Sequence, residues 1–178
     1  MKLRILCVSV LITFVGILAY SFVSTELFYD STLSGKNDTL AVYMNMFDEG
    51  AYSALDEGAA ADFSQKLNGA RITFIDAEGN VLADSEDIEI DENHLGREEV
   101  EEAAEEGEGF AVRRSNTMGI DYAYYCRSFT QNGATFYVRI AEQVASEWAL
   151  FADFLPTVII YLIIDLLACI LFTYVATY

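Results

Sequence analysis

The sequence is poor in positive charge, proline, histidine and cysteine. Its 178 residues include 10 lysines and arginines against 28 acidic residues, for a net charge of −18, with one proline, one histidine and three cysteines. A chain with this much negative charge repels nucleic acid and anionic lipid. Neither is therefore expected as a partner. Only Cys126 lies outside the apolar ends, which excludes a disulfide framework in the middle. We expect Cys126 to be a small buried residue on a strand, with an intermolecular bridge as the alternative.

The sequence also has few of the patterns that carry chemistry. It contains no GxxxxGK[ST] phosphate loop, no HExxH pair and no Cys/His cluster with zinc spacing. We therefore expect no catalytic residue, no cofactor and no metal site in this chain.

Charge is segregated along the chain. Acidic residues begin at Glu26, and only Asp153 and Asp165 lie beyond Glu147. An acidic middle domain between two apolar ends is therefore expected. A domain of this charge favours cations and cationic partners.

The first apolar run covers residues 5–23, which are 19 residues without a charge. This length spans a hydrocarbon core of about 30 Å. Lys2 and Arg4 precede the run, which places the N-terminus in the cytoplasm. The alternative is a cleaved signal peptide, but its apolar core would be shorter.

The second apolar run covers residues 154–178, with Pro156 in its expected outer turn and Asp165 near its centre. A carboxyl group at that depth is costly, so Asp165 is expected either to set helix pairing in a dimer or to be a protonated acid without a role. No Lys or Arg follows Arg139. We therefore expect a fragment cut at the membrane boundary, with a natural two-helix protein as the alternative.

The middle domain begins with helical periodicity over residues 26–68, which predicts one long or broken helix. Alternation then predicts strands at RITFID and VLADS, joined by the turn AEGN. A short helix is expected over residues 97–106, followed by the strands FAVRRS, DYAYYCRSFT and ATFYVRIAE. Five antiparallel strands with helices on one face give an α+β domain.

Four blocks of sequence carry a resemblance: RITFIDAEGNVLADSE, ENHLGREEVEEA, TMGIDYAYYCRSF and FYVRIAEQV. Together, over about residues 70–144, they resemble the extracytoplasmic PAS-like (single Cache) domain of phosphate-regulon (PhoR-type) and WalK-type sensor histidine kinases of Gram-positive bacteria. Glu98 stands where members often carry proline, which implies a looser entry to the short helix.

The resemblance implies a PAS-like domain with a five-stranded antiparallel sheet and a long N-terminal helix, flanked by two transmembrane helices. The expected divisions are residues 1–25, 26–148 and 149–178, with the domain outside the bacterial cytoplasmic membrane and both termini inside. The resemblance also implies a homodimer. It further implies an ATP-dependent kinase core that lies outside this chain and acts on a response regulator. The alternative is a standalone membrane adaptor whose acidic domain binds a cationic partner or a divalent cation.

A ligand in the pocket of such a domain would touch the sheet and the loop above it. The side chains expected there are Arg113, Tyr122, Tyr124 and Arg127, although a tyrosine-rich strand is also typical of core packing. An extracytoplasmic protein or a mechanical input is an equally good stimulus.

Two further features have a functional and a structural interpretation. His94, among carboxylates that would raise its pKa, suits a pH or metal sensor, or is an ordinary hydrogen-bonded loop histidine. The acidic run over residues 86–92 suits Ca²⁺ or Mg²⁺, or is a solvated loop without EF-hand spacing.

Overall fold

The structure is a computed structural model that describes residues 2–52, 54–86, 93–114, 120–131 and 133–175. It divides into two compact units. One comprises residues 33–144, and the other comprises residues 1–32 together with residues 145–178.

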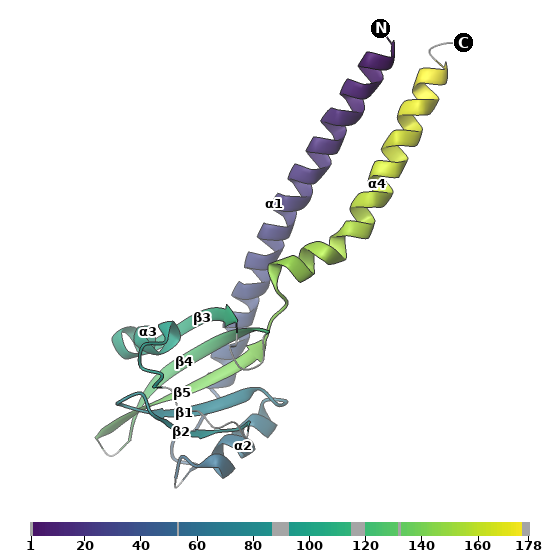
Figure 1. Cartoon of the computed structure of the whole chain (residues 1–178). Helices are drawn as coiled ribbons and strands as arrows, with labels where there is room; N and C mark the ends of the chain where they lie inside the picture. Colours follow the sequence, from purple (N-terminus) through teal and green to yellow (C-terminus); the bar gives the residue numbers. More distant parts are fainter. Residues whose placement is uncertain (1, 53, 87–92, 115–119, 132, 176–178) are drawn as a thin grey trace. The chain divides into compact units, whose positions relative to one another are not determined.

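The unit of residues 33–144 is built on a five-stranded antiparallel sheet (Figure 1). Its strands are β1 (Arg71–Asp76), β2 (Val81–Asp84), β3 (Glu108–Arg114), β4 (Asp121–Gln131) and β5 (Ala134–Gln143). The spatial order is β2-β1-β5-β4-β3, so the first strand of the chain pairs with the last. The expected α+β fold, with a five-stranded antiparallel sheet and a long N-terminal helix, is confirmed.

One face of the sheet packs against helices that precede β1 in the chain. The helix predicted over residues 26–68 is broken into the C-terminal part of α1 (Lys2–Met44) and α2 (Glu57–Lys66). The Asp56 side chain begins α2 by accepting a hydrogen bond from the Ala59 amide at 2.9 Å. The buried residues of this core come from both helices and four strands; they include Leu40, Met44, Phe63, Leu67, Ile72, Phe74, Tyr125 and Val138.

The other face of the sheet is covered by α3 (Glu98–Glu106). Val100 and Ala103 of this helix pack with Ile75, Cys126 and Tyr137, and all five are buried. The expectation of helices on one face only is therefore wrong. The sequence of α3 is so acidic that its two buried apolar positions gave little indication of a covered face.

Cys126 lies on β4 and is fully buried, as expected for a small apolar residue. Burial raises the pKa of its thiol to about 12, so the thiolate needed for disulfide exchange is scarce.

The second unit holds the remaining part of α1 and α4 (Glu147–Val175). Among the residues that the structure describes, two helical stretches are long and apolar enough to cross a membrane: Val8–Met44 and Glu147–Val175. Phe28 and Phe154 pack edge to face, with ring centroids 6.1 Å apart.

Pro156 lies inside α4 rather than in an outer turn, because the helix already begins at Glu147. A proline at an interior position has no N–H to donate to the carbonyl of Ala152, which kinks a helix. Figure 1 shows α4 bending between its first turns and the rest of its length.

Candidate functional site

The candidate site is the sheet face beneath α3, where cross-strand pairing gathers arginine, tyrosine and acidic side chains. Residues directly opposite each other in antiparallel strands point to the same face. Asp84, Thr73, Arg139 and Cys126 are successive partners from β2 to β4, and so form one row on this face.

Two further rows lie on the same face. Tyr124 lies opposite Ala141, which lies opposite Arg71, and Arg113 lies opposite Tyr122 at the next position along β3 and β4. Alternate residues of β4 thus face α3, and the intervening residues face α1 and α2.

Glu99 of α3 is the acidic centre of this face and is fully buried. Its Oε1 accepts hydrogen bonds from Arg113 Nη2 at 2.7 Å and from Arg139 Nη1 at 3.2 Å. Burial alone would raise the pKa of Glu99, but the two guanidinium groups outweigh it and hold the pKa below its ordinary value. Glu99 is therefore ionised at neutral pH.

Tyr124 supports both arginines from beneath. The guanidinium carbon of Arg113 lies 4.1 Å from the centroid of the Tyr124 ring, and that of Arg139 lies 5.2 Å from it. Stacking of this kind occupies the flat face of a guanidinium and leaves the N–H groups at its edge available for hydrogen bonds.

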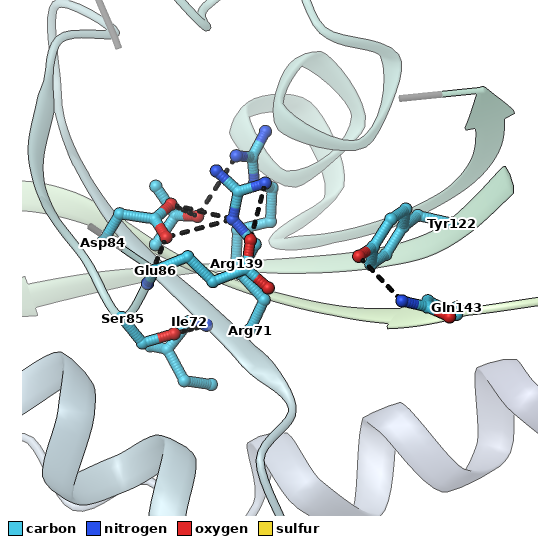
Figure 2. Close-up of polar contacts among 9 residues, drawn as sticks. Arg71, Ile72, Asp84, Ser85, Glu86, Tyr122, Arg139 and Gln143 are labelled. Atoms are coloured by element: carbon cyan, nitrogen blue, oxygen red, sulfur yellow. Dashed lines mark hydrogen bonds and ion pairs between the residues drawn. The ribbon is translucent and has the colours of Figure 1, made fainter. Parts of the chain in front are cut away.

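A second buried ion pair joins this centre from β1 and β2 (Figure 2). Arg71 Nε donates to both carboxylate oxygens of Asp84, at 3.0 and 3.2 Å. Thr73 Oγ1 donates to Asp84 Oδ2 at 2.7 Å and accepts from Arg139 Nη2 at 3.1 Å. One continuous polar network thus runs from Asp84 to Glu99.

A groove of about 270 Å³ opens at the Arg71 end of this network. Its lining includes Arg71, Glu86, Tyr122, Glu142 and Gln143. Figure 2 shows Tyr122 beside Gln143, whose amide donates to the tyrosine hydroxyl oxygen at 3.3 Å. The groove is polar, and Glu86 lies 3.5 Å from Arg71 Nη1.

His94 lies at the edge of the same buried region and is 5% exposed. Burial, followed by the charges of Arg139, Arg97 and Arg113, lowers its pKa to about 4. The expectation that carboxylates would raise this pKa is wrong, because the groups that face His94 in the fold are mainly arginines. Its backbone amide donates to the Gly79 carbonyl at 2.8 Å.

The predicted ligand-binding residues are divided by the sheet. Arg113, Tyr122 and Tyr124 come together on the α3 face, while Arg127 lies on the opposite face and donates to Asn45 Oδ1 at 2.7 Å. Arg127 therefore cannot share a site with the other three. Ligand binding by these residues stays a prediction.

Sequence reasoning missed the four charged residues at the centre of the network: Arg71, Asp84, Glu99 and Arg139. A signal for Arg139 was present, because it stands inside a strand among apolar residues, whereas Arg71 is the first residue of its strand. Nothing in the acidic run that contains Glu99 distinguished it from its exposed neighbours.

Two other predicted sites involve different residues. Asp165 lies on α4, where it lines a cavity of about 610 Å³ together with Thr13 and Ser21 of α1. Of the acidic run weighed as a Ca²⁺ or Mg²⁺ site, Glu86 is described, and residues 87–92 lie outside the described residues.

Comparison with known proteins gives a family for the middle domain. The model of the family described as single Cache-like matches residues 31–143, more than half of the chain. No curated protein sequence matches this chain.

Several solved structures are similar to the chain. The ligand-binding domain of the Campylobacter jejuni chemoreceptor Tlp3 matches in complexes with L-norvaline and with 4-methylisoleucine, at 13% and 14% identity and TM-scores of 0.48 and 0.46. These matches cover 83% and 78% of this chain, and 63% and 60% of the receptor domain. The extracellular domain of rpHK1S-Z16, described as a histidine kinase, matches at 13% identity and a TM-score of 0.40, over 49% of this chain and 37% of that domain. The chain thus spans less than two thirds of each of these structures.

Proposed function

This chain belongs to the single Cache-like family, and we propose that it is the signal-receiving, membrane-anchored portion of a two-component histidine kinase. The observation that carries the proposal is the order along the chain. The family domain at residues 31–143 lies between two apolar runs, residues 5–23 in α1 and the run from residue 154 in α4, each long enough to cross a membrane. A sensor that must report across a membrane has this arrangement.

The finer assignment, to the phosphate-regulon or cell-wall type, is supported by the four sequence blocks that resemble PhoR-type and WalK-type sensors. The same resemblance supports a homodimer. Lys2 and Arg4, at the N-terminal end of the first apolar run, support a cytoplasmic N-terminus with the acidic domain outside.

The stimulus is proposed to act on the sheet face beneath α3, where Arg113, Tyr122 and Tyr124 lie. A stimulus shifts a sensor only if its two states differ in affinity for that stimulus. The charges of buried Glu99 and Arg139 and of half-buried Arg113 suit this requirement, because their pairing is sensitive to any new charge or hydrogen bond nearby.

A chimera tests the proposal. The chain is joined after Tyr178 to the HAMP and kinase modules of a sensor kinase of known activity, and autophosphorylation from ATP is measured in membrane vesicles. Replacing residues 33–144 by a Gly/Ser linker should change the autophosphorylation rate severalfold. Equal rates with and without the domain would argue against a signal-receiving role. The unfused chain should not turn over ATP.

The net charge of −18 also favours a second function, a membrane adaptor that binds a cationic partner. The genomic reading frame beyond Tyr178 separates the two functions. A frame that continues into kinase modules supports the sensor, whereas a stop codon at that point supports the adaptor.

A further inference from the structure

Helix α4 is longer than a membrane span requires. Its 29 residues, Glu147–Val175, extend about 44 Å at a rise of about 1.5 Å per residue, whereas a hydrocarbon core is about 30 Å thick. The part after Pro156, residues 157–175, extends about 28 Å and nearly crosses the core by itself. The residues before Pro156 are therefore left over, at the end of α4 that follows the family domain.

Pro156 separates this first segment of α4, residues 147–155, from the rest of the helix. The segment has its own start, because Ser146 Oγ accepts a hydrogen bond from the Ala149 amide at 3.2 Å. A long apolar helix can also be accommodated by a tilt of its whole length. Figure 1 instead shows α4 bending after its first turns, as expected of an interior proline. The first segment is therefore free to leave the axis of the span.

The first segment carries an apolar face with the largest side chain of the chain. Trp148, Phe151 and Leu155 lie three and seven positions apart, which places them on one side of the helix. Trp148 is the only tryptophan and is 80% exposed, and its ring packs edge to face on Phe151 with centroids 6.0 Å apart. Leu155 is exposed as well. The described residues thus leave this face largely uncovered.

A contact with α1 sets the level of the segment against the first apolar run. Phe154 packs against Phe28, and both residues belong to the same compact unit. Phe28 lies five residues beyond the end of that run at residue 23. Phe154 is therefore level with a part of α1 that already lies outside the run, so the first segment of α4 begins its course at the edge of the hydrocarbon core.

The side chains of the segment restrict what covers its apolar face. Tryptophan is enriched at the boundary between hydrocarbon and water, because its ring is apolar while its indole N–H seeks a partner. Glu147 and Asp153 are costly inside the core; Glu147 is at the far end of the segment, and Asp153 is on the side opposite Trp148. In water, a helix this short is marginal unless its apolar face is buried. The interfacial layer of a bilayer meets both requirements.

We propose that residues 147–155 lie in the interfacial layer of the bilayer, on the domain side of the membrane, with Trp148, Phe151 and Leu155 turned toward the acyl chains. The occupant of this face is lipid and not a second copy of the chain. The contact is made by apolar side chains, so the expected repulsion of anionic lipid by this acidic chain still holds. The inference rests on the proposed membrane anchoring, and it adds a segment that holds α4 at a fixed depth.

The single tryptophan makes the depth of the segment measurable. The whole chain is reconstituted in phosphatidylcholine vesicles, and the fluorescence of Trp148 is quenched by lipids brominated either near the headgroup or near the end of the acyl chain. An interfacial helix lies about 5–10 Å into the boundary between headgroups and acyl chains, so shallow bromine should quench about twofold or more strongly than deep bromine. Quenching by neither lipid would mean that water or protein covers Trp148. That result, or stronger quenching by deep bromine, would overturn the proposal.

A second tryptophan position keeps this test separate from the proposed membrane anchoring. In a variant with Trp148→Phe and Leu167→Trp, the ring is near the middle of residues 157–175, and deep bromine should quench it more strongly than shallow bromine. If this variant is quenched as expected while Trp148 in the unaltered chain is not, α4 crosses the membrane and only the interfacial segment is refuted. If neither tryptophan is quenched, the membrane anchoring of α4 fails as well.

Paired substitutions identify the face that meets lipid. Phe151→Asp places a carboxylate on the apolar face and should reduce shallow quenching of Trp148 about twofold or more, because the segment is lifted toward water. Leu155→Asp, on the same face and closer to the span, should have the same effect. Ala149→Asp is the matched control, because it adds the same charge on the side opposite Phe151 and should leave the quenching unchanged. Equal quenching in all three variants would overturn the assigned face.

Discussion

A Cβ atom at Gly109 would stand 2.4 Å from the carbonyl oxygen of Glu99. Helix α3 therefore approaches the start of β3 so closely that only glycine fits beneath it. The same approach lets Phe110 N donate to Glu102 Oε2 at 2.9 Å. This close packing holds Glu99 in its buried position between Arg113 and Arg139.

Gly109→Ala should destabilise the chain by about 1–3 kcal/mol, the usual cost of overpacking a well-packed site. The clashing atoms are backbone as well as side chain, so they cannot move aside freely. Thermal unfolding of the whole chain in detergent, followed by circular dichroism, measures the change. Gly96→Ala is the matched control, because its nearest new contact would be a side-chain oxygen 3.9 Å away. Equal stability of the two variants would contradict the close approach of α3.

Asp84→Asn should cost up to about 3–5 kcal/mol, because it removes the buried counter-charge that is hydrogen-bonded to Arg71 and leaves only the partly exposed Glu86, 3.5 Å away. Both side chains of this pair are over nine-tenths buried. Asp62→Asn removes the partner of an exposed pair with Lys66 and serves as the control, with little expected effect. Urea unfolding in detergent compares the two. Similar midpoints would mean that the Arg71–Asp84 pair is not buried as described.

Acid should destabilise the domain through His94. The pKa of His94 is about 4 in the folded chain, against an ordinary value of 6.5. The unfolded chain therefore binds a proton that the folded chain does not, so stability falls as pH falls from 6.5 to 4. Between pH 7 and pH 5 the loss is about 2 kcal/mol. Thermal melts at the two pH values measure it, and His94→Gln should remove most of the difference. An unchanged pH dependence in that variant would show that other groups are responsible.

The acidic domain should be reachable from outside whole cells. Gln65 is exposed on α2, so Gln65→Cys in a variant without other cysteines is a suitable labelling site. Ser85 would be a poorer choice, because its hydroxyl accepts a hydrogen bond from the Ile72 amide at 2.9 Å. An impermeant maleimide should label Gln65→Cys and not Lys2→Cys. The reverse pattern would invert the proposed topology.

Asp165 should influence pairing of α4 between two copies of the chain. A carboxyl group within an apolar helix is expected to seek a polar partner, and such contacts contribute about 0.6–2 kcal/mol. Asp165→Ala should therefore change disulfide crosslinking along residues 158–172 by roughly 3- to 30-fold, with Asp165→Asn closer to wild type. Ile163→Ala, at an exposed position on the same helix, is the control. Identical crosslinking by all variants would leave Asp165 without a role in pairing.

The sequence by itself determined the elements of this protein. Strands were predictable because Ile72 and Phe74 alternate with Thr73 and Ile75, and local alternation alone decides which face a strand residue points to. The two apolar helices were predictable for a similar reason, since length and lack of charge are local properties. The start of α4 was not predictable from the apolar run, because the polar residues before that run also belong to the helix.

Only the tertiary structure decided which charges are buried and which residues meet. Glu99 and Glu98 are adjacent in an acidic run, yet one is fully buried and the other exposed, because α3 turns only one side toward the sheet. Arg127 is separated from Tyr124 by the thickness of the sheet, and the charges of three arginines, one of them on the distant strand β5, act on His94. These outcomes depend on strand order and helix placement, which come from contacts between residues far apart in the chain.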